Sequence, residues 1–385
     1  MEADRVRRQL AEITDTRPGD WFFFSRARDA MAVVYQTLRD HAGPGDVVTQ
    51  AFTCLTAVSP ILAGGLTPVY GDIEAETYSL DPATVPLTPA TRAVVAQHTF
   101  GLIGASTRAL AERAHGAGAI FIEDCAHGLG EMVRTEDGAP VADVSIHSFG
   151  AEKTLPTFFG GAAWINPAME PRPVRAALIA SARALGQPGW RSRAAARTYA
   201  LQAGVYSRTG SMGRSLGARA ERAGLFWPPI TDVELAGGHL SPTSPSPWMM
   251  REVSRELCRL PQIRRSRREV AAVYARSLGG AVDYPDLVRS ACSLVRFPVS
   301  IPARCGLTGE DVLAALTAAG APVDAWYRPL LYPGPADPAR YHLDGSLAAL
   351  PRTRELSERV LTLPVDVDPS EASAIAECLV EVVTA

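Results

Sequence analysis

The feature that most constrains the fold is an alternation of short, β-rich apolar runs with helix-like stretches over the first 165 residues. Helix-like stretches such as Asp29–Arg39 and Ser106–Gly116 separate the runs. Nearly continuous apolar strands with helices between them are typical of a largely parallel sheet covered on both faces. Ligands of such sheets bind beyond the carboxyl ends of the strands, so residues that follow a strand are candidates for function. The predicted strands are Asp46–Gln50, Thr67–Tyr70, Ala93–Gln97, Ala119–Glu123, Val144–Ser148 and Gly161–Ile165.

The rest of the chain predicts a helical insert and a smaller domain. Residues 170–221 are rich in Ala and Arg, and the six arginines between Arg172 and Arg197 indicate either an anion site or, as we prefer, a solvated helix face. A Pro/Ser loop over 241–247 and a long helix over Met249–Arg276 follow. We therefore expect an α/β fold with a large domain over 1–245 and a small α+β domain over 246–385. The small domain's expected elements are Arg296–Ile301, Gly309–Ala319, Arg359–Leu363 and Pro369–Val383.

Composition and charge exclude several classes of protein. The 385 residues are 47% hydrophobic and 21% charged, and the net charge of −3 gives no reason to expect a nucleic-acid partner. No apolar run reaches the roughly 18 residues of a membrane span, and the N-terminus lacks the apolar core of a secretory signal. We expect a cytoplasmic protein with no membrane partner. The six cysteines are scattered without a CxxC pair, so we expect neither a disulfide framework nor a metal site.

One residue count points to a reactive group. Of the 38 basic residues, 37 are arginine and one is Lys153. A genome rich in G and C explains the arginines, and chance could leave one lysine on the surface. Arginine, however, cannot act as a neutral amine nucleophile, because its guanidinium does not deprotonate in proteins. Lys153 is therefore a candidate for amine chemistry, chiefly Schiff-base formation with a carbonyl.

Two strand ends carry the residues that such chemistry needs. One reads Glu123-Asp124-Cys-Ala-His127, so that two carboxyl groups end a strand and a histidine follows. The other reads Ser148-Phe-Gly-Ala-Glu-Lys153, so that a hydroxyl ends a strand and the lysine follows five residues later. Both loops open on the same edge of a parallel sheet.

A carboxylate, a lysine and a hydroxyl at one edge fit pyridoxal 5′-phosphate (PLP). The lysine holds the aldehyde as an imine, and a carboxylate beside the pyridine nitrogen favours the protonated ring. Hydroxyls and backbone N–H groups at a helix N-terminus hold the phosphate.

Over nearly its whole length the sequence resembles the DegT/DnrJ/EryC1/StrS aminotransferases, fold-type-I PLP enzymes that act mainly on nucleotide-linked keto-sugars. The Glu-Asp-x-Ala-His and Ser-Phe-x-x-x-Lys pair is the specific signal. The resemblance implies a mostly parallel central sheet and a homodimer, because these active sites are assembled at a subunit interface. Its other motifs are Gly43-Pro-Gly-Asp46, Gly65-Leu-Thr-Pro68-Val-Tyr-Gly-Asp72, Thr88-Pro-Ala-Thr91, His98-Thr-Phe-Gly101, Gly320–Tyr327 and Leu361-Thr-Leu-Pro364.

The resemblance also implies roles for single residues. Lys153 would form the Schiff base and move the proton, and Asp124 would pair with the pyridinium nitrogen. His127 would lie near the phenolic oxygen of the cofactor. Ser148 would bind the phosphate.

The turn at the start of the first long helix resembles the family's phosphate-binding turn of small residues. The backbone amides of Arg28 and Asp29 would therefore help to hold the phosphate.

Alternatives stay open for several of these residues. Glu123 could face the site instead of Asp124, although the motif favours Asp124, and His127 could be a core histidine. We expect His98 to support the backbone and His147 to point to the opposite face of its strand.

The sequence departs from the family pattern at two places. Cys54 stands where many members have an aromatic residue that stacks on the pyridine ring, so it is the expected contact there. The stretch Leu240-Ser-Pro-Thr-Ser-Pro lacks the Asn that reaches the partner subunit's phosphate in many members. Thr243 or Ser244 would have to make that contact.

The leading functional interpretation is a PLP-dependent aminotransferase that moves an amino group from an amino acid, by resemblance L-glutamate, to a keto-sugar. The alternatives are another PLP reaction, such as elimination, racemisation or decarboxylation, and a non-catalytic PLP-binding protein.

Overall fold

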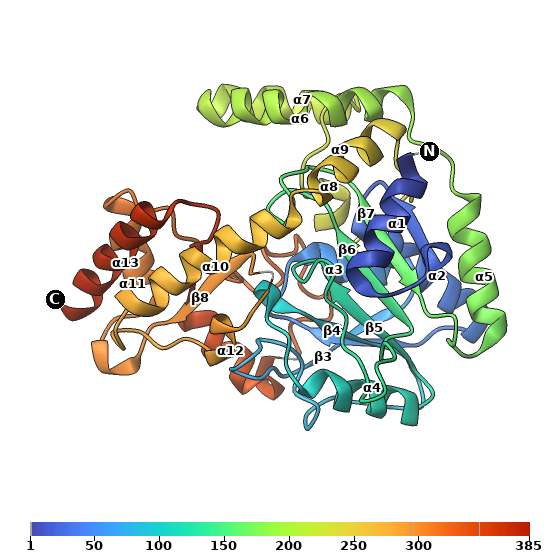
Figure 1. The fold of residues 1–385 in the computed structure, drawn as a ribbon, viewed down its shortest axis with the longest axis horizontal. Helices are drawn as coiled ribbons and strands as arrows, with labels where there is room; N and C mark the ends of the chain where they lie inside the picture. The colour runs from blue at the N-terminus through green and yellow to red at the C-terminus, as the bar shows by residue number, and fades with distance from the viewer. Residues whose placement is uncertain (1, 293, 346) are drawn as a thin grey trace.

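A seven-stranded sheet forms the centre of one half of the molecule, and a two-stranded sheet lies in the other half (Figure 1). The computed structural model describes residues 2–292, 294–345 and 347–385. The order of the large sheet is β1-β7-β6-β5-β4-β2-β3. Its strands are β1 (Trp21–Phe24), β2 (Asp46–Gln50), β3 (Thr67–Gly71), β4 (Thr91–Gln97), β5 (Ile120–Cys125), β6 (Val144–Ser148) and β7 (Gly161–Ile165).

The pairing of the strands confirms the predicted sheet type. Strands β2, β3, β4, β5 and β6 pair only in parallel with one another, whereas β7 runs antiparallel to both β6 and β1. All six strand runs predicted from the sequence are strands of this sheet. The prediction missed β1, a run of four aromatic residues that pairs with β7 at the edge.

Helices cover both faces of the large sheet. On one face, α2 (Ala27–Ala42), α3 (Leu55–Ala63) and α5 (Arg172–Ala184) share an apolar core with Val95 and Ile122. On the other face, α4 (Ser106–Gly116) packs on Val94 and Phe121. Neighbouring residues on β4 and β5 thus point to opposite faces, as the two-residue period of a strand requires. The continuous apolar runs follow from this double burial.

The N-terminal segment forms α1 (Glu2–Thr14), which the sequence analysis did not predict. Val6 and Leu10 of α1 share a core with Trp21, Trp164 and residues of α9, at the sheet end opposite to α4. Two buried side chains four residues apart anchor an otherwise polar helix.

The Ala/Arg-rich stretch forms helices, as expected. After α5 come α6 (Trp190–Arg208) and α7 (Gly210–Arg222), which pack against each other and lie along the top edge of the view in Figure 1. The single-turn helix α8 (Asp232–Leu235) follows.

The long helix predicted over Met249–Arg276 is wrong. The structure has two helices instead, α9 (Pro247–Leu257) and α10 (Leu260–Ser277). Pro261 lies in the first turn of α10, where its missing N–H costs nothing, and it cannot continue α9 because it offers no hydrogen bond to the preceding turn.

The second half of the molecule pairs β8 (Arg296–Ser300) with β9 (Val360–Pro364) antiparallel. Its helices α10, α11 (Gly309–Ala318), α12 (Pro351–Arg359) and α13 (Pro369–Thr384) share one apolar core with these strands. Among the described residues, no helix combines the length and apolar character that a membrane crossing requires. Short 3₁₀ helices span Pro18–Asp20, Thr99–Gly101, Asp286–Arg289, Ala303–Cys305 and Leu347–Ala349.

Candidate active site

A cavity opens at the carboxyl ends of β4, β5 and β6, at the edge where a parallel sheet binds its ligands. It encloses about 810 Å³, its open mouth included. Gln97 ends β4, Ser148 ends β6 and Asp124 is the last residue but one of β5, and all three residues line the cavity. The loop after β6 adds Lys153, and the start of α2 forms the facing wall.

Lys153 and His127 meet in this cavity. The Nζ atom of Lys153 lies 2.8 Å from Nε2 of His127. Burial lowers the pKa of Lys153, and burial together with the charge of Lys153 lowers the pKa of His127 well below its usual value. Both shifts favour the neutral forms, so the pair is poised to exchange a proton rather than to hold two charges.

The hydrogen bonds of His127 assign its tautomer. The backbone N–H of Phe100 donates to Nδ1 at 3.0 Å, which requires a lone pair on that nitrogen. The single proton of the neutral ring therefore sits on Nε2, which faces Lys153 Nζ and, at 3.4 Å, the hydroxyl of Tyr327. His127 thus presents a hydrogen-bond donor to the cavity, and Lys153 offers an amine lone pair.

The two carboxyl groups at the end of β5 point in opposite directions. Asp124 lines the cavity, accepts a hydrogen bond from the Ala126 amide at 2.9 Å, and has its pKa raised by burial. Glu123 lies on the other face, where it accepts hydrogen bonds from the Val133 amide at 2.9 Å and the Ser145 hydroxyl at 3.2 Å. Asp124 is therefore the carboxyl group that can meet a ligand, and Glu123 ties the loop to the sheet.

The other histidines lie outside the cavity. His98 Nε2 lies 3.1 Å from Glu123 on the far face of β5. His147 points away from Ser148, packs against Trp21 and accepts the Gly130 amide at 3.3 Å. His98, Glu123 and Cys125 bring three ligand-type atoms together, but hydrogen bonds already occupy these atoms: Glu123 with His98, and the Cys125 thiol with the Glu131 carbonyl.

A hydroxyl and a helix start form the opposite end of the cavity. Ser148 Oγ accepts a hydrogen bond from the Gly150 amide at 3.2 Å. The start of α2 packs directly on β7 at Gly161, where a Cβ would lie 2.4 Å from the Ala27 nitrogen. Only glycine permits this approach, which brings the positive end of α2 to the cavity.

Arg28 and Asp29 lie at this helix start but differ in position. Arg28 lines the cavity and forms an ion pair with the buried Glu234 of α8. Asp29 is not among the residues lining the cavity, and its amide donates to the Arg26 carbonyl at 3.1 Å. Burial raises the pKa of the Asp29 carboxyl group to about 6.

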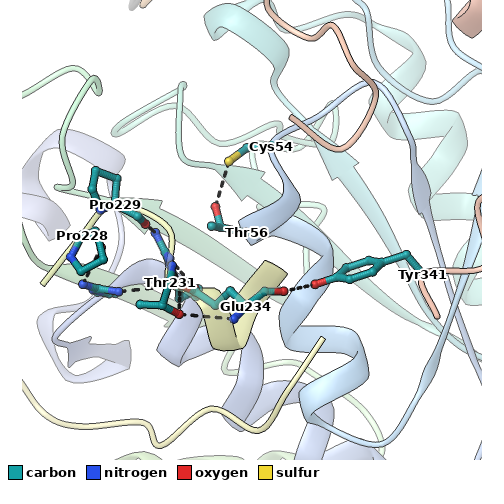
Figure 2. Close-up of polar contacts among 9 residues, drawn as sticks. Cys54, Thr56, Pro228, Pro229, Thr231, Glu234 and Tyr341 are labelled. Carbon is teal, nitrogen blue, oxygen red and sulfur yellow. Dashed lines mark hydrogen bonds and ion pairs between the residues drawn. The ribbon is translucent and has the colours of Figure 1, made fainter. Parts of the chain in front are cut away.

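Cys54 also lines the cavity, and its Sγ lies 3.1 Å from Oγ1 of Thr56 (Figure 2). Nearby, Thr53 donates to the side chain of Gln97 and so fixes the end of β4 beside Asp124.

The sequence analysis missed an aromatic layer that reaches the cavity from the second half of the molecule. Tyr327 lies nearly parallel to Phe100 at 5.8 Å and to Trp326 at 5.6 Å, and it lines the cavity. Burial raises its pKa well above the usual value, so it stays a neutral donor. Tyr327 is the last residue of the family motif Gly320–Tyr327, and this motif is the sequence signal that points to it.

Arg26, Tyr199 and Trp227 were missed as well, and all line the cavity. The structure thus brings Lys153, Asp124, His127, Ser148, Arg28 and Cys54 together and leaves Asp29 behind the wall. Thr243 and Ser244, the two residues expected to reach a partner subunit, both bond within the chain: the Thr243 hydroxyl donates to Ser25 at 2.8 Å, and the Ser244 hydroxyl donates to the Gly186 carbonyl at 3.1 Å.

The sheet and its site define the class that the resemblance implied, the fold-type-I PLP enzymes. The residues fit the cofactor: an amine that burial favours in the neutral form, a buried carboxyl group, and a hydroxyl beside a helix start line one cavity. The chain matches the DegT/DnrJ/EryC1/StrS aminotransferase family over residues 24–209 and 253–380, and it belongs to that family. This match confirms the resemblance and PLP as the cofactor of the family.

Relatives and solved structures agree with this assignment. The chain is 37% identical over 131 residues to the L-glutamine:2-deoxy-scyllo-inosose aminotransferase of Streptoalloteichus tenebrarius, covering 33% of this chain and 30% of that protein. It is 29% identical over 179 residues to the spore coat polysaccharide biosynthesis protein SpsC of Bacillus subtilis, covering 40% and 46%. The alignments thus span less than half of these curated relatives.

The aminotransferase TlmJ from Streptoalloteichus hindustanus has a similar fold. Its TM-score is 0.71 at 21% identity, with 100% of this chain and 92% of that chain covered. The similarity confirms the predicted fold class.

Proposed function

We propose that the protein is a PLP-dependent aminotransferase that takes an amino group from an amino acid and gives it to a keto-sugar. The observation that carries the proposal is the meeting of Lys153, the chain's sole lysine, with His127 in a cavity that also holds Asp124. When bound, PLP supplies an aldehyde that forms a Schiff base with an amine and a ring that accepts electrons.

Lys153 is the proposed covalent anchor of the cofactor and the group that moves the proton. Burial lowers its pKa and so favours the neutral amine, the form that can attack a carbonyl and later accept and return a proton. The Nε2–H of His127 is directed at the same point and donates to a neighbouring nitrogen or oxygen.

Asp124 is the proposed partner of the ring nitrogen. Burial raises its pKa because it disfavours the charged form, and a cationic partner placed against the carboxylate would stabilise that form. At the opposite end, Ser148 and the start of α2 are the proposed phosphate contacts.

The acceptor is proposed to be a nucleotide-linked keto-sugar. Relatives named for such acceptors include the UDP-2-acetamido-2-deoxy-3-oxo-D-glucuronate aminotransferase of Pseudomonas aeruginosa, 32% identical over 142 residues. Another relative is named for a cyclic ketone, 2-deoxy-scyllo-inosose, and for L-glutamine as donor. We propose L-glutamate as the donor here, and glutamine is the competing donor to test.

We further propose a cytoplasmic homodimer in which residues 1–245 form the large domain and 246–385 the small domain. The apolar core around β8 and β9 draws mostly on residues 270–383, which supports this division, and Phe52, Phe100 and Leu102 of the large domain pack into it.

The proposal is tested by the first half of the reaction. The PLP-loaded protein, incubated with L-glutamate or L-glutamine in the absence of an acceptor, is expected to release the matching keto acid in an amount equal to that of the enzyme. Because PLP ends up carrying the amino group, its visible absorption band should fall in parallel. A protein that holds PLP yet releases no keto acid from any amino acid would contradict the proposal.

A further inference from the structure

Two arginine side chains lie together in the cavity wall at the start of α2. Arg26 is buried, its guanidinium lies 4.0 Å from the centre of the Trp227 ring, and it donates to the Pro228 carbonyl at 3.0 Å. Arg28 donates to the Pro229 carbonyl at 2.6 Å, and Figure 2 shows these proline carbonyls and Glu234 gathered at the site. The segment 227–234 therefore holds both cations against the cavity.

Contacts other than those with the two arginines hold Glu234 in place. Its carboxylate accepts the amide and the hydroxyl of Thr231 at 2.9 and 2.8 Å, which closes a capping box around α8. Its backbone carbonyl accepts the hydroxyl of Tyr341. A carboxylate that already accepts two hydrogen bonds from Thr231 has less rotamer freedom left to lose, so it orients the arginines at a reduced entropic cost.

The arginines share a single carboxylate at close range. Glu234 forms an ion pair with Arg28 and lies 4.0 Å from Arg26. Burial and the charge of Arg28 lower the pKa of Arg26 to about 9, so Arg26 stays a cation at neutral pH and is destabilised by the neighbouring guanidinium. Asp29 and Glu221 also interact with the charge of Arg26, and neither is among the residues lining the cavity.

The cavity side of this wall is consequently cationic. Arg26 and Arg28 line it, and the charge of Arg28 contributes to the lowered pKa of the Lys153 amine in the same cavity. The positive end of α2 adds to the same field. An oxyanion placed there would relieve the repulsion between the two guanidinium groups.

We propose that Arg26 and Arg28, oriented by Glu234, form a phosphate-oxyanion site that makes the protein select a phosphorylated ligand over its unphosphorylated counterpart. The inference rests on the proposed function, because that function supplies two phosphorylated ligands. One source is the phosphate of PLP, and the other is the diphosphate of a nucleotide-linked acceptor.

The test measures phosphate selectivity rather than turnover. Dissociation constants for PLP and for pyridoxal are measured by absorption titration of the apoprotein, for the wild type, Arg26→Met and Arg28→Met. If the cofactor phosphate uses the site, the preference for PLP over pyridoxal falls by about 10- to 100-fold in each variant, the size of one charge-assisted hydrogen bond. Affinity for pyridoxal stays within about threefold of the wild type, because the uncharged ligand makes no such bond.

A second titration separates the two sources. Uridine diphosphate is titrated into the PLP-loaded wild type and the same variants by calorimetry. If the acceptor diphosphate uses the site, affinity for uridine diphosphate falls by about 10- to 100-fold while the preference for PLP is unchanged. Unchanged values in both titrations would overturn the inference.

Two control variants distinguish a loss of the site from misfolding. Arg26→Lys keeps the charge and should retain most of the selectivity, and the exposed Arg172→Met, whose arginine pairs with Glu170, should match the wild type. In the wild type itself, added salt should weaken PLP far more than pyridoxal. If the wild type gives a visible band with both PLP and pyridoxal but binds the two with equal affinity, the inference is overturned and the proposed function stands. If it gives no band with either aldehyde, both are overturned.

Discussion

The cavity is built from two regions that reach it by different routes. The ends of β4, β5 and β6 bring Gln97, Asp124 and Ser148 together, because parallel neighbouring strands end at one edge. The segment 227–234 follows the helices α6 and α7, far along the chain, yet it places Trp227 and Pro229 on the facing wall. The first region presents side chains proposed to contact the cofactor, and the second holds the guanidinium groups of Arg26 and Arg28.

The difference shows that the part of a site formed by strand ends can be predicted from the sequence, whereas the part positioned by tertiary contacts cannot. Strand ends are positioned by the sheet itself, so their spacing in the sequence predicts their meeting. The segment 227–234 is positioned by tertiary contacts such as the stacking of Arg26 on Trp227 and the bond from Tyr341 to Glu234.

The largest effect is expected at Lys153. Lys153→Arg keeps the positive charge but removes the only side-chain amine, so the visible band with PLP should disappear and the rate of amino transfer should fall at least about 10³-fold. The measurement is the absorption spectrum with PLP together with keto-acid release from glutamate. Turnover within tenfold of the wild type would contradict the role of Lys153.

A matched pair of substitutions on β5 should separate chemistry from structure. Asp124→Asn removes the charge that faces the cavity, so the rate should fall about 10²- to 10³-fold. Burial raises the pKa of Asp124, which means that its ionised form costs stability; the asparagine variant should therefore unfold at an equal or higher urea concentration.

Glu123→Gln should show the reverse. It disturbs hydrogen bonds to Val133 and Ser145 on the buried face, so the free energy of unfolding should fall by about 1–3 kcal/mol. Activity per folded molecule should stay within a few-fold of the wild type. Exchanged results for the two variants would mean that Glu123, not Asp124, serves the cavity.

The smallest effect is expected in the segment 227–234. Thr231→Ala removes the capping box of α8 and should lower the free energy of unfolding by about 1 kcal/mol, the usual value of an N-cap. Because Glu234 then loses part of its support, the phosphorylated ligand that uses the site should bind more weakly, by less than the loss seen in Arg26→Met. Urea denaturation and the titrations with PLP and uridine diphosphate are the measurements, and unchanged affinity for both ligands would separate α8 from the site.

Much of the fold and part of the site could be predicted from the sequence. The runs 46–50, 144–148 and 161–165 match β2, β6 and β7 at both ends, because short runs that contain Val, Ile or Trp and lie next to Gly, Asp or Asn are typical of strands. The helix α1 was missed because only Val6, Leu10 and Ala11 anchor its apolar side. The break between α9 and α10 was missed although Pro261 marks it.

The site divides in the same way. Asp124, His127, Ser148 and Lys153 stand in two short motifs at strand ends, where residue type and position together indicate chemistry. Arg26, Trp227 and Glu234 could not be predicted, since an arginine among 37 arginines carries no signal and its partners lie about 200 residues away. Such pairs become visible only once the chain is folded.

The most direct test of the central claim uses the scarcity of amines in this chain. The PLP-loaded protein is reduced with borohydride, digested and analysed by mass spectrometry, which locates any Schiff base as a stable pyridoxyl group. Lys153 is the sole side-chain amine, and the chain terminus is the other amine of the chain. The account predicts a pyridoxyl group on Lys153 in an amount equal to that of the protein. A label confined to the terminal amine, or no label in a protein that retains PLP, would contradict it.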